Sequence, residues 1–401
     1  MAELNLIPEL RFPEFEGIWE EKKLGEAFQN SRKKGNSSLP IFSVSQAHGL
    51  IARDSLDRNI QKNAKPEANL AVVSGDLVYN MMRMWQGAIG LAHSESMVSP
   101  AYVVLHPKKN ENSTFYSYLF AKKRSLYLFW AYSYGLTDDR LRLYFKDFSN
   151  IKRRVPSNTE QQKIASFLTA VDKRIQLLQK KKAKLEEYKK GVMQKLFPTK
   201  AGQAPEIRFK DENGNDFPGW EEKKLGEIGE IITGKTPITS DKELWNGGID
   251  FITPTDIIDE IKYQKIVART VCETEKMRIL PKGAIVYTCI ASIGKMAITT
   301  KPAITNQQIN ALVMNEEHLN EFVYYFLLKQ TPKIKSTQAN TTLPIINKTE
   351  FSKIMIVIPS LPEQKKIANF LTSLDNSIES VSKEIEGIST FKKGLLQKMF
   401  V

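Results

Sequence analysis

The sequence predicts two tandem α/β (α+β) domains, separated by long helices that form an antiparallel coiled coil, with a pseudo-two-fold internal repeat. The first observation behind this is the octapeptide WEEKKLGE, which occurs at 19–26 and again at 220–227. The second is a longer segment that recurs at 156–197 and 359–400. Because both repeats have nearly the same offset in a chain of 401 residues, they indicate duplication of a half-length unit.

The recurring segment predicts a long helix in each half of the chain. Its apolar residues are spaced alternately by four and three positions, which is typical of a coiled-coil seam. Lysines interrupt the pattern at Lys182, Lys189 and Lys392. At 1.5 Å per residue each helix would be about 57 Å long. The positions expected to pack helix against helix are Ile164, Leu168, Val171, Ile175, Leu178, Ile367, Leu371, Leu374, Ile378 and Val381.

Each long helix could instead be an amphipathic helix that packs only on its own domain. The presence of two complementary seams in one chain favours pairing, and antiparallel pairing is expected because each helix follows its own globular domain. The globular parts would then lie at opposite ends of a rod. Ser157 with Glu160, and Ser360 with Glu363, match the S-x-x-E pattern of a capping box at the start of each helix.

The two variable segments predict mixed α/β structure. The predicted domains are 1–155, a helical region 156–198, a second variable domain 199–358 and a second helical region 359–401. Apolar and β-branched runs predict strands at 70–80, 101–106, 283–290 and 354–359. Longer apolar runs predict helices at 115–130 and 319–330.

The composition describes a globular protein with an excess of positive charge. The net charge is +13 and the isoelectric point is near 9.4, which favours an anionic partner, nucleic acid first, although many basic proteins bind none. No run approaches the roughly 20 apolar residues of a membrane span. The two cysteines, Cys272 and Cys289, make a disulfide framework or a zinc site improbable. We expect a cytoplasmic protein that binds no membrane.

Polar loops in both variable domains carry side chains suited to DNA. Lys and Arg hold phosphates, and Asn, Gln and Arg form paired hydrogen bonds with base edges. Each of these residues could equally belong to a solvated loop. The candidates in the first domain are Arg32, Lys33, Lys34, Asn80, Arg83, Trp85, Gln86, Tyr132, Tyr134, Arg140 and Arg142. Those in the second domain are Lys235, Thr288, Ser292, Lys295, Asn306, Gln307, Gln308, Gln338, Asn340 and Thr341.

The sequence shows no catalytic constellation. It contains no Walker-type phosphate loop, no dinucleotide fingerprint and no Asn/Asp-Pro-Pro-aromatic motif of amino-methyltransferases. The four histidines are scattered along the chain. These absences favour a binding protein over an enzyme with an unrecognised site, and they leave open a scaffold that binds only other proteins.

The motifs resemble those of the specificity (S) subunits of type I restriction–modification systems. The pattern P-x-x-x-E-Q-x-K-I-A-x-F-L-x-x-x-D begins at both Pro156 and Pro359 and ends at Asp172 and Asp375. The lead-in that ends in LGE, the stretch ASIGK at 291–295 and the stretch NQQINAL at 306–312 are also similar to this family. In the first domain MWQGAIG and VSPAYVV stand in place of the last two.

The resemblance implies that each variable domain is a target recognition domain for one half of a bipartite, asymmetric DNA sequence. It implies that the helices set the gap between the halves and dock two adenine-methylating modification subunits. ATP-dependent restriction subunits would complete the complex on double-stranded DNA. The chain itself would be non-catalytic and would bind no cofactor, because S-adenosylmethionine, ATP and Mg would belong to the partner subunits.

Overall fold

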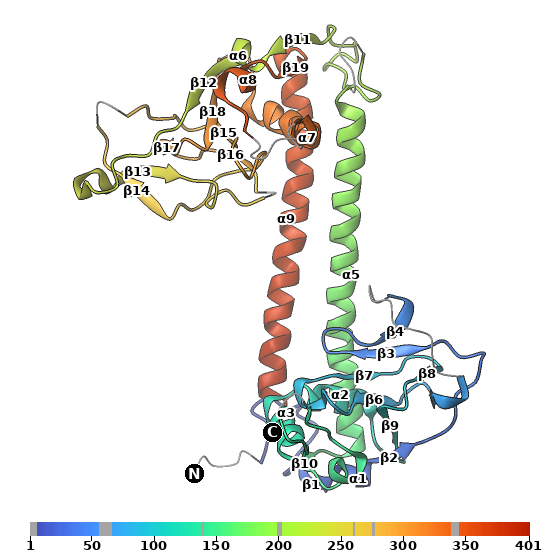
Figure 1. Ribbon diagram of the computed structural model, residues 1–401. Helices are drawn as coiled ribbons and strands as arrows, with labels where there is room; N and C mark the ends of the chain where they lie inside the picture. The colour runs from blue at the N-terminus through green and yellow to red at the C-terminus, as the bar shows by residue number, and fades with distance from the viewer. Residues whose placement is uncertain are drawn as a thin grey trace. The chain divides into compact units, whose positions relative to one another are not determined.

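The computed structural model shows two compact units (Figure 1). Unit 1 comprises residues 1–179 and 384–401, and unit 2 comprises residues 180–383. Both boundaries fall inside the long helices α5 (Asn158–Leu196) and α9 (Leu361–Lys398), so each unit contains one variable domain and part of both helices. The structure describes residues 6–55, 66–137, 140–198, 203–259, 261–274, 277–337 and 345–401.

The main sheet of unit 1 has four antiparallel strands in the order β2-β9-β6-β7. Its central strand β6 is covered on both faces, because Leu77 and Tyr79 join the larger core while Val78 joins a second cluster. The strands of this sheet are β2 (Phe28–Ser31), β9 (Tyr102–Pro107), β6 (Leu77–Asn80) and β7 (Ile89–Leu91). Two further antiparallel pairs are β3 (Phe42–Ser45) with β4 (Gly49–Ala52), and β5 (Leu70–Val72) with β8 (Ser96–Val98).

The helices of unit 1 differ from the predicted ones at one point. The run 115–130, predicted as one helix, forms two helices, because Lys122 has an extended backbone and its ammonium reaches the carbonyl oxygen of Leu396 in α9. The short helices are α1 (Leu24–Ala27), α2 (Ser113–Phe120), α3 (Lys123–Ala131) and α4 (Phe145–Phe148), with 3₁₀ turns at Arg53–Ser55, Pro66–Ala68 and Met84–Gln86.

Unit 2 repeats the sheet order of unit 1 with a different elaboration. Its main sheet has the order β12-β18-β15-β16, and a second sheet has the order β14-β13-β17 with β13 and β17 parallel. The strands are β12 (Gly229–Thr233), β13 (Trp245–Ile252), β14 (Arg269–Val271), β15 (Ile285–Thr288), β16 (Met296–Ile298), β17 (Ala303–Thr305) and β18 (Ile309–Met314). The helices are α6 (Leu225–Ile228), α7 (Asn320–Thr337) and α8 (Lys348–Ser352), with a 3₁₀ turn at Lys242–Leu244.

The repeated octapeptide ties the start of each variable domain to its end. In unit 1 the EEKK letters form β1 (Glu20–Lys23), which pairs with β10 (Lys152–Val155) immediately before α5. In unit 2 they form β11 (Glu221–Lys224), which pairs with β19 (Met355–Ile358) immediately before α9. The glycine is needed for close packing, since a Cβ at Gly25 would lie 2.7 Å from the Cβ of Ser149.

The two long helices pack side by side and antiparallel within each unit, which confirms the predicted coiled coil. In unit 1, Asp172 pairs with Lys392 at 2.5 Å and Arg174 pairs with Glu384 at 2.6 Å, so residue numbers rise in one helix as they fall in the other. All ten predicted seam positions are buried or half-buried.

The predicted capping boxes form only in part, because one of the two hydrogen bonds is present at Ser157 and neither glutamate side chain turns back to the start of its helix. The Ser157 hydroxyl accepts a hydrogen bond from the amide of Glu160 at 3.4 Å, but the Glu160 carboxylate turns away to Arg11. Glu363 turns in the same way to Arg208, and the buried Ser360 hydroxyl has no hydrogen-bond partner among the described residues. A carboxylate gains more from a guanidinium than from one backbone amide, and this decides the geometry.

Candidate nucleic-acid interface

Two of the predicted groups of unit 1 come together. The turn after β6 carries Asn80, Arg83 and Gln86, and the amide of Leu143 donates to the carbonyl of Met81 in this turn at 2.9 Å. Residues 140–143 therefore lie beside the turn. They in turn pair with residue 134, because the backbone groups of Tyr134 and Arg142 exchange two hydrogen bonds of 3.0 and 2.9 Å.

The side chains of this group present both hydrogen-bonding and basic chemistry. Arg83, Arg140 and Arg142 are exposed, and Tyr134 is 63% exposed. A guanidinium nitrogen of Arg83 donates to the side-chain oxygen of Gln86 at 3.1 Å, which orients both side chains. Exposed arginines beside a glutamine can bind phosphate and a base edge.

The hairpin formed by β3 and β4 also approaches this turn, and sequence reasoning missed it. The side-chain amide of Gln46 donates to the backbone carbonyl of Gln86 at 2.8 Å. The close approach depends on Gly90, since a Cβ there would lie 2.1 Å from the amide nitrogen of Leu50. The polar tip SQAHG between two short apolar runs was the available signal.

The basic run of unit 1 has different neighbours. Arg32, Lys33 and Lys34 are exposed, as a phosphate-binding run requires. Their backbone is held by β5, because the amide of Ala71 donates to the carbonyl of Lys33 at 2.8 Å and Lys34 bridges to Leu70. The run is therefore positioned by a different sheet from the one that carries the Asn80–Gln86 turn.

Two aromatic candidates of unit 1 are half-buried. Trp85 and Tyr132 both lie against the main core rather than standing free in solvent. The indole nitrogen of Trp85 is buried, so it cannot reach a base edge without movement of its neighbours. Aromatic rings beside an apolar core gain more from burial than from exposure, which explains why these two turn inward.

Three loops of unit 2 gather at one end of its main sheet. The hydroxyl of Thr236 donates to the side-chain oxygen of Gln307 at 2.7 Å, which joins the loop after β12 to the turn before β18. The amide of Cys289 donates to the carbonyl of Gln308 at 2.8 Å, which adds the loop between β15 and β16. Lys235, Ser292 and Gln307 are exposed on these loops.

The remaining candidate side chains of these loops already interact with other groups of this chain. The Asn306 amide donates to the side-chain oxygen of Gln308 at 2.9 Å, and both residues are half-buried. The Lys295 ammonium lies 4.0 Å from the carboxylate of Asp259, so an arriving phosphate would compete with an acidic group. The loops thus offer amides, hydroxyls and two lysines, which is chemistry for hydrogen bonding to DNA rather than for bond breaking.

The structure contradicts the prediction that Thr288 faces phosphate. It is fully buried, and its hydroxyl donates to the carbonyl of Ser292 at 2.5 Å while accepting from the amide of Lys295 at 2.9 Å. The residue therefore shapes the ASIGK loop from inside. A threonine at the end of a buried strand satisfies loop backbone groups that would otherwise be unpaired.

Two further segments concern this end of unit 2: the predicted loop 336–342 and the turn 253–256. Gln338, Asn340 and Thr341 lie outside the described residues, and the chain that follows them is joined to the loops by a hydrogen bond of 2.9 Å from the amide of Ile346 to the carbonyl of Cys289. Sequence reasoning missed the turn 253–256. This turn lies beside Asn306, because the backbone amide of Asn306 donates to the carbonyl of Ile252, the residue just before the turn, at 3.3 Å. Its signal was the polar TPTD directly after an apolar strand.

The cysteine that lies beneath these loops, Cys289, is expected to be unreactive. Cys289 is buried, and burial raises the pKa of its thiol to about 11. Its thiolate is therefore scarce at neutral pH, which makes it a poor nucleophile. Among the residues that the structure describes, no group of three or more His, Cys, Asp or Glu side chains is arranged to hold a metal ion.

Gly294 has a backbone conformation in the ASIGK loop that favours glycine. Its φ is +91°, and a Cβ there would lie 2.3 Å from the Cγ2 of Thr331. We expect Gly294→Ala to destabilise the protein by about 1–2 kcal/mol, the cost of a left-handed backbone for a residue with a Cβ. Thermal unfolding measures this. Gly248→Ala is the control, because nothing lies within 4 Å of its added Cβ, and equal effects of the two substitutions would contradict the argument.

Comparison with known proteins agrees with the duplicated architecture. The family model for the "Type I restriction modification DNA specificity domain" matches residues 17–187 and again residues 218–390. The type I restriction enzyme HindI specificity subunit of Haemophilus influenzae is 24% identical over 439 residues, covering 90% of this chain and 95% of that protein.

Two further proteins give a partial match and a structural one. The type I restriction enzyme MjaIX specificity subunit of Methanocaldococcus jannaschii is 32% identical over 204 residues, covering 49% of this chain and 47% of that protein, so the match spans about half of that relative. The S subunit of a type I restriction–modification system from M. genitalium has a TM-score of 0.62 at 16% identity, covering 98% of this chain and 99% of that one, which shows a shared fold.

The family assignment follows from these matches. None of them supports the alternative of a scaffold that does not bind DNA.

A separate finding concerns membranes. Among the described residues, no helix combines the length and the apolar composition that a membrane span requires.

Because the family model matches both halves over most of their length, the chain belongs to the family of type I restriction–modification DNA specificity domains and is a specificity subunit that recognises the DNA target of such a system.

Proposed function

We propose that each unit reads one half of a bipartite, asymmetric DNA target. The observation that carries this proposal is that the two units share one sheet order but present different loops at its end. A shared frame with different reading side chains suits two different half-sites in one target. The loops of unit 1 carry arginines, whereas those of unit 2 carry amides and hydroxyls, so their preferred base edges differ.

The proposed contacts are exposed or half-buried side chains on these loops. In unit 1 they are Gln46, Arg83, Gln86, Tyr134, Arg140 and Arg142, with Arg32, Lys33 and Lys34 on phosphates. In unit 2 they are Lys235, Ser292, Lys295, Asn306, Gln307 and Gln308. Asn80 supports its turn instead, because its side-chain oxygen accepts from the amide of Met82 at 2.9 Å.

The partners are proposed on the basis of the family. The helices would dock two adenine-methylating modification subunits, and restriction subunits would join them on double-stranded DNA in the cytoplasm. This chain would supply recognition only, with S-adenosylmethionine, ATP and Mg bound by the partners. Most exposed side chains of the two helices are polar, and Leu177, Tyr188 and Phe391 are exposed large apolar side chains among them, which suits a surface that docks a partner.

Replacing one variable domain tests the independence of the two readers. We expect a chain whose residues 215–358 come from another specificity subunit to direct methylation to a target changed in one half only. The unchanged unit 1 keeps its loops, so the other half-site should persist. Sequencing of methylated positions in cells that also carry the modification subunits gives the result. A change in both half-sites would contradict independent reading.

Shortening both helices tests whether they set the gap. Removing 176–182 and 379–385 deletes one heptad from each helix between the Asp172–Lys392 and Lys189–Asp375 ion pairs, so both pairs stay matched. Seven residues correspond to about 10 Å of helix, or about three base pairs. We expect the same two half-sites with a shorter gap, and an unchanged gap would contradict a spacer role.

A further inference from the structure

One face of α5 carries lysines that are not among the proposed DNA contacts. From residue 173 to residue 184 the helix has six basic residues and no acidic one. An α-helix turns by about 100° per residue, which places Lys173, Lys180 and Lys184 in one row and Lys181 next to it. We call these four lysines the basic face of α5. Leu178, which is buried in the seam, lies about 140° from the row, so the basic face points away from the seam.

No carboxylate of the described chain neutralises the basic face. Its four lysines are exposed, and none of them forms an ion pair among the described residues. Arg174, which lies closer to the seam, does pair with a carboxylate, that of Glu384 at 2.6 Å. Lys180 and Lys184 are four positions apart, where like charges repel across one turn of the helix. An anion bound between them removes this repulsion.

The other long helix does not repeat the basic face. The equivalent positions of α9 hold one lysine, one acidic residue and two uncharged ones, which are Asn376, Lys383, Glu384 and Gly387. The lysine among them, Lys383, pairs with Glu379 at 3.1 Å. Because both helices share the seam, packing between them does not account for the difference. The basic face therefore indicates an anionic partner that meets α5 alone.

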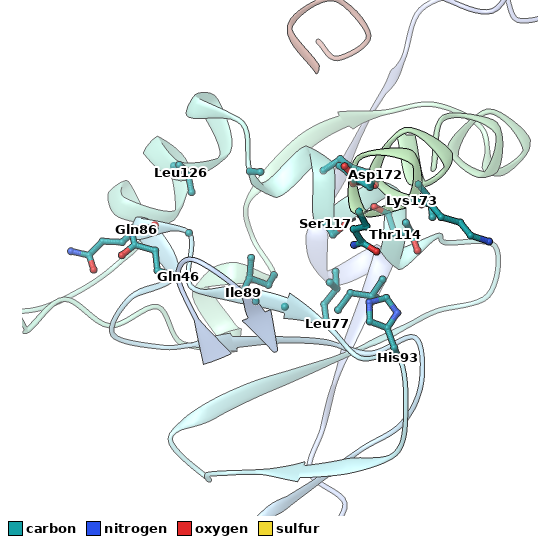
Figure 2. Close-up of a pocket in the computed structure, with 18 residues that line it drawn as sticks. Gln46, Leu77, Gln86, Ile89, His93, Thr114, Ser117, Leu126, Asp172 and Lys173 are labelled. Atoms are coloured by element: carbon teal, nitrogen blue, oxygen red, sulfur yellow. Dashed lines mark hydrogen bonds between the residues drawn. The ribbon is translucent and has the colours of Figure 1, made fainter. Parts of the chain in front are cut away.

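The basic face begins beside proposed base contacts of unit 1 (Figure 2). Lys173 lines a groove of about 880 Å³ that Gln46 and Gln86 also line, with the two glutamines at one end and the lysine at the other. From Lys173 the face continues along α5 as far as Lys184, a rise of about 17 Å, which corresponds to about five base pairs of DNA. The helix itself continues from unit 1 into unit 2.

We propose that the basic face of α5 binds phosphates of the DNA gap between the two half-sites. Ammonium groups hold phosphate oxygens whatever the neighbouring bases are, which suits a stretch of the target whose sequence is not read. The contact belongs to α5 alone, so it makes the two helices unequal in their hold on the DNA. The inference rests on the proposed function, because only a bipartite target has such a gap.

An acidic protein surface is the competing occupant, because the exposed Leu177 lies among the lysines. DNA is favoured for two reasons. The family recognises a DNA target, and the face begins at the groove that Gln46 and Gln86 line. The two occupants differ in what they require of the DNA, since only a phosphate contact depends on the charge of the gap.

Removing the charge of the basic face tests the contact through its salt dependence. The variant Lys180→Gln/Lys181→Gln/Lys184→Gln is made in the full chain and assembled with modification subunits. We expect it to bind target DNA roughly 10–100-fold more weakly at about 0.1 M salt. The slope of log affinity against log salt concentration should become shallower by about 2–3, near one for each lost phosphate contact. The half-sites and the gap length should stay the same, because no base contact changes.

The matched control removes the same charge from the other helix. Lys365, Lys383 and Lys393 of α9 are exposed, and their joint replacement by glutamine should leave the slope nearly unchanged. An equal change of slope in both variants would show a general effect of net charge and would overturn the inference. A basic-face variant that keeps the original slope but loses its modification subunits would show a protein contact instead, and would overturn it as well.

Neutral linkages in the DNA locate the contact. Methylphosphonates in the gap remove the phosphate charges there, and the same number of methylphosphonates outside the target is the control. We expect the gap substitution to weaken binding of the unchanged chain and to have much less effect on the basic-face variant. Equal losses for the two chains would place the lysines away from the gap and overturn the inference. An unchanged chain that recognises no bipartite target would instead overturn the proposed function.

Discussion

Replacing Glu363 with alanine should destabilise the protein by about 3 kcal/mol, because it leaves the Arg208 guanidinium without its carboxylate. Glu363 is completely buried and accepts two hydrogen bonds from Arg208, at 3.0 and 2.7 Å. This cost is at the low end for a broken buried ion pair, because the Arg208 side chain is 21% exposed and water can partly replace the lost carboxylate. Arg208 also donates to the carbonyl of Pro218 at 2.7 Å, so the loss would loosen the entry into unit 2.

Thermal unfolding measures this effect. A unit of this size should lose about 2–4 °C of midpoint per kcal/mol. Glu379→Ala is the matched control on the same helix, because Glu379 is exposed and its ion-pair partners among the described residues, Lys265 and Lys383, are exposed too. Surface pairs of this kind contribute little. If the two substitutions lowered the midpoint equally, the buried pair would not have the role assigned to it.

Replacing Asp375 with alanine should cost about 2–3 kcal/mol, because it leaves the Lys189 ammonium without its carboxylate and removes the carboxylate to which the Tyr325 hydroxyl donates. Lys189 is 18% exposed and lies over the Tyr325 ring at 5.5 Å, so it has little access to water. Burial, followed by the nearby Asp375 charge, raises the pKa of Tyr325 well above its usual value. The phenol therefore stays protonated and can donate to the carboxylate across the whole physiological pH range.

A double-mutant cycle distinguishes this pair from two independent residues. Replacing both partners, as in Lys189→Met with Asp375→Leu, should recover most of the stability, since a buried ion pair replaced by apolar side chains is often neutral. The coupling should exceed the 0.3–0.5 kcal/mol that separates additive from interacting sites. Additive effects in thermal unfolding would show that the two residues do not interact. Asp172 with Lys392 in unit 1 provides the same cycle in the duplicate.

The repeats allowed the helix pair to be predicted from the sequence because periodicity reports which face is buried. The lysines that interrupted the seam, Lys189 and Lys392, could be located but not explained. Each pairs with an aspartate of the other helix at the equivalent place, so their partners lie 186 and 220 positions away in sequence. Spacing along one helix contains no information about such a partner.

The candidate interface was less predictable, since burial of a polar side chain depends on the rest of the fold. Thr288 has the chemistry of a phosphate contact, yet it ends a buried strand and supports its loop from within. Trp85 resembles a stacking residue, yet it packs on the core. Glu160 matched a capping pattern, but Arg11, 149 positions earlier, provides a stronger partner.

Sequencing of modified bases in cells that carry this chain with its modification subunits tests the central claim most directly. The account predicts a bipartite, asymmetric motif with N6-methyladenine in both halves, which disappears when this chain is removed. Assembly of the complex must be confirmed in the same cells. An assembled complex that produces no such motif would contradict the account.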